Sequence, residues 1–125
     1  AILGEGGRLD GPVVVLNLDK DNPGIALGIA AELRRGGIRA EAYMGASGMR
    51  PQMKYADRRA SPAVVIVGGD EIAKGTVTIK DLEIGAQQAQ AISSNEEYRE
   101  ARPGQIEVPR TEMVAAVRKI VEAQR

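Results

Sequence analysis

The stretch Ala63-Val64-Val65-Ile66-Val67-Gly68-Gly69-Asp70-Glu71 decides the fold of this chain. Five apolar residues, four of them β-branched, follow one another without a polar interruption and stop at two glycines. Such a run predicts a strand that is buried on both faces. A strand of this kind belongs in the middle of a sheet, so we expect helices on both sides of it.

Strand and helix signals alternate on either side of this run. We expect five strands, each marked by a short apolar or alternating stretch: residues 13–16, 38–43, 63–67, 76–82 and 105–108. We expect three main helices, each with apolar positions three or four residues apart: residues 23–35, 49–60 and 110–123. Asn22 and Pro23 are good residues for the N-cap and first turn of the first helix.

The predicted fold class is α/β, a three-layer arrangement in which a mixed five-stranded sheet is flanked by helices. The glycine-rich residues 1–11 predict a linker, followed by one domain over residues 12–125. Polar residues 84–104 predict a surface insertion with a short helix near 95–102.

The composition excludes several classes of function. Lys and Arg together number 17, as do Asp and Glu, so the net charge is zero, which counts against binding of nucleic acid through a basic surface alone. The chain has no Cys and no His, which removes thiol nucleophiles, the common zinc sites and His-based acid–base catalysis. No apolar run reaches the ~20 residues that span a bilayer, and no signal peptide opens the chain, so we expect a cytoplasmic protein without a membrane partner.

The residues at the predicted carboxyl ends of the parallel strands allow two other types of site. Asp19 and Asp21 could bind a metal ion, but these residue types more often form a solvated turn and helix cap. A response-regulator receiver would need an Asp at the end of the third strand, whereas Asp70 comes three residues after Val67. The glycine pairs match neither a dinucleotide motif nor a phosphate loop.

The predicted helix over 49–60 is locally basic. Arg50 and Lys54 could contact phosphates, although such residues more often form a solvated helix face. Gln52 offers both a donor and an acceptor to a base edge.

Glu71 and Lys80 are a more specific candidate pair, because we expect them to lie close together, with Glu71 at the mouth of the sheet and Lys80 on the strand that leaves it. A carboxylate accepts from base N–H groups while a cation donates to base carbonyls or phosphate, which together can read splayed-out RNA bases. A surface ion pair worth about 0–1 kcal/mol is the alternative.

Four motifs resemble the C-terminal anticodon-binding domain of histidyl-tRNA synthetases, which are class II aminoacyl-tRNA synthetases. They lie in order and at compatible spacing within residues 12–125, and they begin at Gly24-Ile25-Ala26-Leu27, Gln52-Met53-Lys54-Tyr55, Val64-Val65-Ile66-Val67 and Gly75-Thr76-Val77-Thr78. The resemblance implies that Glu71, in the G-x-x-E turn, and Lys80, nine positions later, contact anticodon bases. The connection over 84–102 is longer than is typical of the family.

The resemblance also implies what surrounds the domain. The partners are the histidine-type anticodon loop of a tRNA and a parent catalytic domain, within a homodimeric ligase that uses ATP and Mg. This chain itself has no catalytic site and needs no cofactor. A regulatory or paralogous domain that binds another RNA or a protein is an alternative, and a small-molecule-binding α/β domain is another.

Overall fold

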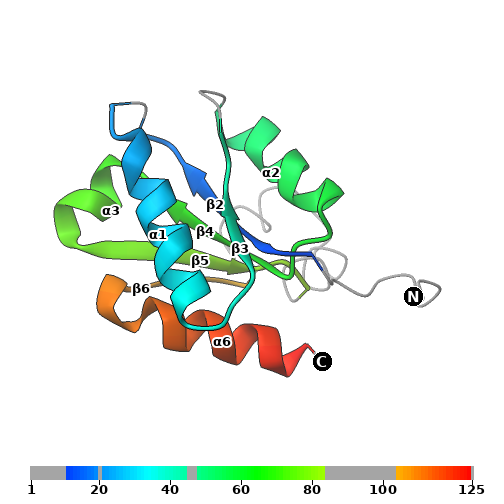
Figure 1. Cartoon of the computed structure of the whole chain (residues 1–125). Helices are drawn as coiled ribbons and strands as arrows, with labels where there is room; N and C mark the ends of the chain where they lie inside the picture. Colours follow the sequence, from blue (N-terminus) through cyan, green and yellow to red (C-terminus); the bar gives the residue numbers. More distant parts are fainter. Residues whose placement is uncertain (1–10, 20, 45–47, 84–103, 125) are drawn as a thin grey trace.

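The computed structural model describes residues 11–19, 21–44, 48–83 and 104–124. Their strands form one sheet in the order β3-β2-β4-β5-β6 (Figure 1). The strand bounds are Val13–Asn17 for β2, Ala40–Ala42 for β3, Ala63–Val67 for β4, Thr76–Asp81 for β5 and Gln105–Pro109 for β6. The predicted five-stranded sheet is therefore confirmed, with the apolar run at 63–67 as its middle strand.

The sheet is mixed, as expected. β2 pairs in parallel with β3 and with β4, β5 is antiparallel to β4, and β6 is antiparallel to β5. Asn17, Val67 and Thr76 consequently lie at one edge of the sheet, which we call the carboxyl edge because β2, β3 and β4 all end there.

Helices cover both faces of the sheet (Figure 1). α1 and α6 cover one face, and α2 covers the other. The short α3 lies at the carboxyl edge between β4 and β5. The helix bounds are Pro23–Arg35 for α1, Met49–Arg58 for α2, Gly69–Lys74 for α3 and Met113–Ala123 for α6, which the 3-10 turn η1 (Arg110–Glu112) precedes.

Alternate residues of β4 supply two separate cores. Val65 and Val67 pack with the buried side chains of α1 and α6, which include Ile29 and Met113. Val64 and Ile66 pack toward α2 around Ala56. The strand is thus buried on both faces, as its uninterrupted apolar sequence predicts.

β3 is shorter than the predicted strand over 38–43. Ile38 does not join the strand because its N–H donates to the carbonyl of Leu33 at 3.0 Å. This hydrogen bond keeps Ile38 in the turn that follows the carboxyl end of α1. Gly37 adopts a φ of +86° there, a left-handed conformation that glycine adopts without steric cost.

Asn22 occupies the N-cap position of α1, as the sequence predicts. α1 begins at Pro23 as expected, but the Asn22 side chain makes no cap hydrogen bond and donates to Asp19 Oδ2 at 2.7 Å. Asp19 Oδ1 also accepts from the N–H of Asp21 at 3.0 Å. The loop is therefore a hydrogen-bonded turn, and the described residues contain no group of three or more acidic, His or Cys residues that could hold a metal ion.

Two predictions lie outside the described residues. They are the linker over 1–11, of which only Gly11 is described, and the insertion over 84–104 with its short helix, of which only Gly104 is described. Among the described helices, none is long and apolar enough to cross a membrane.

Candidate functional site

Glu71 is held at the carboxyl edge by two donors. Its Oε1 accepts from the N–H of Gly68 at 3.0 Å, which closes the first turn of α3, and its Oε2 accepts from Thr78 Oγ1 on β5 at 2.9 Å. The side chain is half-buried, while Thr78 is buried. Each carboxylate oxygen keeps a further lone pair, so a fixed acceptor faces any ligand that reaches this edge.

Lys80 lies on the same face of β5 as Thr78, two residues further along the strand. That spacing corresponds to about 7 Å. Lys80 pairs in register with Val64 near the start of β4, whereas Glu71 follows the end of β4. The two predicted residues thus border one face, with Thr78 between them.

A polar surface connects these positions. We call it the β5–β6 polar face, and it consists of Thr76, Thr78, Lys80, Gln105 and Glu107. The alternate residues Val77, Ile79 and Val108 pack into the core on the opposite side, under α1 and α6. α2 packs against β2, and Glu71 of α3 lies over Thr78 at one end of this face.

The negative charge of Glu107 on this face is balanced locally. Its Oε2 accepts from Thr76 Oγ1 at 2.6 Å and pairs with Lys74 Nζ at 3.0 Å. The hydrogen bond with Thr76, then the one with Lys74, lowers the pKa of Glu107, and the same carboxylate raises the pKa of Lys74. The face therefore does not repel an anionic ligand through an isolated carboxylate.

Gln52 has a structural role. Its side chain is fully buried, its Oε1 accepts from the N–H of Asn17 at 3.0 Å, and its Nε2 donates to the carbonyl of Asn17 at 3.0 Å. Both amide atoms thus complete the hydrogen bonding of β2 where the strand ends. The hypothesis that Gln52 offers its amide to a base edge does not fit this placement.

Arg50 and Lys54 are exposed on α2. Arg58 is exposed as well, and the three residues recur every fourth position, so they share one side of the helix. Arg59 is different, because its Nη2 pairs with Glu41 Oε1 at 3.0 Å. Arg50, Lys54 and Arg58 therefore form a cationic side of α2. Arg59 does not belong to it, because its charge is paired with Glu41.

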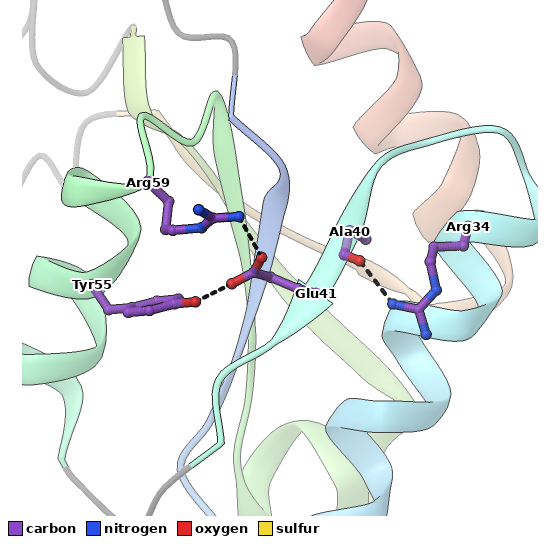
Figure 2. A network of polar contacts seen from close by, with 5 residues as sticks. All are labelled: Arg34, Ala40, Glu41, Tyr55 and Arg59. Carbon is purple, nitrogen blue, oxygen red and sulfur yellow. Dashed lines mark hydrogen bonds and ion pairs between the residues drawn. The ribbon is translucent and has the colours of Figure 1, made fainter.

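A polar network ties α2 to the edge strand β3. Figure 2 shows Glu41 of β3 between Arg59 and Tyr55, whose hydroxyl donates to Glu41 Oε2. On the other side of β3, Arg34 Nη1 donates to the carbonyl of Ala40 at 2.8 Å (Figure 2). The network fixes α2, and with it the cationic side, relative to the sheet.

The two tyrosines in the described part of the chain are used for packing. The rings of Tyr43 and Tyr55 meet edge to face with centroids 5.3 Å apart. The hydrogen bond with Glu41, followed by burial and the charge of Glu41, raises the pKa of Tyr55 above its usual 10.0.

We expect Tyr55→Phe to lower the free energy of unfolding at neutral pH by about 0.5–1.5 kcal/mol, since it removes one half-exposed hydrogen bond. Because the pKa of Tyr55 is raised in the folded state, this contribution is complete below pH 10 and is lost as the pH rises through the folded pKa. Urea unfolding at about pH 8 and pH 11 should therefore show a gap between wild type and variant that narrows at the higher pH. An unchanged gap would show that Tyr55 stabilises only through its ring.

A known protein family matches most of the chain. The family described as "Anticodon binding domain" matches residues 12–120. The chain is 53% identical over 116 residues to the histidine–tRNA ligase of Caulobacter vibrioides, covering 93% of this chain and 23% of that protein. It is 51% identical over 125 residues to the histidine–tRNA ligase of Brucella suis, covering 94% and 25%. The chain thus spans about a quarter of the length of these relatives.

Two solved structures share the fold. The histidyl-tRNA synthetase from Nostoc sp. PCC 7120 superposes with a TM-score of 0.68 at 22% identity, covering 89% of this chain and 22% of that chain. The RNA binding domain of threonyl-tRNA synthetase from Cryptosporidium parvum Iowa II superposes with a TM-score of 0.67 at 14% identity, covering 92% and 26%. Both confirm the α/β arrangement of a mixed sheet flanked by helices.

Proposed function

This chain belongs to the family of anticodon-binding domains, and from that premise we propose that it reads the anticodon loop of a histidine-accepting tRNA. The fixed carboxylate of Glu71 is the observation that carries this proposal. An acceptor whose orientation is set before binding loses little freedom when a base N–H reaches it. Lys80, on the same face, supplies a donor for a base carbonyl or a phosphate.

The cationic side of α2 supports the same function. Arg50 and Lys54 are exposed and suit phosphate contacts, which hold the RNA in register without reading sequence. This division of roles is consistent with a net charge of zero, because a domain that reads a few bases needs only a local basic surface.

The relatives support a proposal for the parent protein. We propose a cytoplasmic histidine–tRNA ligase, a homodimer in which a separate catalytic domain uses ATP and Mg to activate histidine. In that protein, this domain docks the anticodon so that the acceptor end of the tRNA reaches a distant active site.

The proposal is tested by titrating the 125-residue chain with two RNA stem-loops that share a stem. One carries a histidine anticodon and the other an unrelated anticodon. We expect tighter binding of the histidine loop by about 1–3 kcal/mol, the scale of a base-specific contact. Equal binding of both loops would favour a domain that recognises another RNA, and no binding would favour a protein-binding paralogue.

Lys54→Ala is expected to weaken both stem-loops about equally and to reduce the slope of log affinity against log salt by about 1. Lys119→Ala is the matched control, because Lys119 is equally an exposed helix lysine but lies on α6, across the sheet. A titration series in salt checks both variants. If Lys119→Ala changes the slope as much as Lys54→Ala, the phosphate surface does not lie on α2.

A further inference from the structure

Gln105 is the residue that stands out on the β5–β6 polar face. It pairs in register with Lys80 across β5 and β6, and its side chain is half-buried. Among the described residues, no partner accepts from or donates to its amide. We propose that Gln105 reads the edge of a second anticodon base, next to the base that Glu71 reads. This inference rests on the proposed function.

The chemistry of the amide is what fits Gln105 to this role. A glutamine amide donates and accepts at the same time, so it can match a base edge that offers one group of each kind. Gln52 has the same chemistry, but both of its amide atoms are bound to Asn17. Among the described residues of the β5–β6 polar face, Gln105 provides the side-chain amide that can bind a ligand.

The spacing suits two bases that have unstacked. The Lys80–Gln105 pair is two residues along from the Thr78–Glu107 pair in the register of β5 and β6. That separation is about 7 Å, twice the rise of about 3.4 Å between stacked nucleotides. Two neighbouring bases that are splayed apart can therefore each form a hydrogen bond, one with Glu71 and the other with Gln105.

The surrounding residues leave the amide accessible to an anionic strand. The opposing Lys80 contributes a positive charge beside Gln105, and the charge of Glu107 is compensated by Lys74. The described tyrosines pack against each other, so recognition at this face relies on hydrogen bonds rather than on stacking over aromatic rings.

The test is a set of stem-loops that differ from the histidine loop at one anticodon base at a time, titrated against wild type, Gln105→Leu and Glu71→Ala. Gln105→Leu keeps the bulk of the side chain and removes its donor and acceptor. We expect Gln105→Leu to reduce the preference for the histidine-type base about 5- to 150-fold, at one anticodon position only. Glu71→Ala is expected to lose the preference at a different position.

Ile106→Ala is the control, because Ile106 is the next residue on β6, faces the opposite side and is 47% exposed. It should leave every preference unchanged. The inference is overturned if Gln105→Leu weakens all loops equally, changes nothing, or matches Ile106→Ala. If wild type shows no preference among the loops, both the proposed function and this inference are wrong. If Glu71→Ala behaves as expected while Gln105→Leu keeps every preference, the Gln105 assignment alone is wrong.

Discussion

Gln52→Leu is expected to lower the free energy of unfolding by about 2–4 kcal/mol. The leucine keeps the bulk of the side chain at a fully buried position, but it leaves both the N–H and the carbonyl of Asn17 without their partner. Each buried backbone group without a partner costs about 1–3 kcal/mol, and Asn17 is half-buried, so water offsets part of the loss.

Urea unfolding followed by circular dichroism measures this effect, with Gln105→Leu as the matched control. The same exchange at Gln105 removes no hydrogen bond within the described residues, so we expect a change of less than about 0.5 kcal/mol. Equal losses in the two variants would contradict a structural role for the Gln52 amide.

Glu71→Ala is expected to weaken binding of the histidine stem-loop by about 1–3 kcal/mol while barely changing binding of a loop with another anticodon. The variant also removes the acceptor for Gly68 N–H and Thr78 Oγ1, which should destabilise the fold by about 0.5–2 kcal/mol, the usual cost of a lost helix cap. Titrations are therefore run well below the melting temperature of the variant.

Glu71→Gln separates the two roles of this side chain. The amide oxygen can still accept from Gly68, which retains the first turn of α3, but the negative charge and one acceptor are lost. We expect near-native stability with reduced preference for the histidine anticodon. An unchanged preference in both variants would leave Glu71 with a structural role only.

The sequence predicted the fold because local patterns and global packing agree in this chain. The uninterrupted run at Ala63–Val67 became a strand buried on both faces, and α1 begins at Pro23 as the sequence indicated. The errors occur where a tertiary or local hydrogen bond overrides a preference. Ile38 stays bonded to Leu33 instead of opening β3, and the side chain of Asn22 bonds to Asp19 instead of capping α1.

Fewer features of the candidate site could be predicted from the sequence. Glu71 could be placed because the two glycines after β4 fix its distance from the end of the strand. Which side chains of α2 are buried depends on the rotation of the helix about its axis, and the mixed pattern of apolar and polar residues around Pro51 does not indicate that rotation. The helix buries Gln52, whereas Met49 is 40% exposed. Gln105 became visible only once the register of β5 and β6 placed it opposite Lys80.

A chemical-shift map tests directly whether Glu71 and the β5–β6 polar face read the anticodon. Backbone amide resonances of the 125-residue chain would be followed during titration with the histidine stem-loop and with the unrelated loop. We predict that residues 68–80 and 105–107 shift with the histidine loop and not with the other loop, while α1 and α6 stay unperturbed. Shifts confined to α1 and α6, or identical shifts with both loops, would show that the β5–β6 polar face does not read the anticodon.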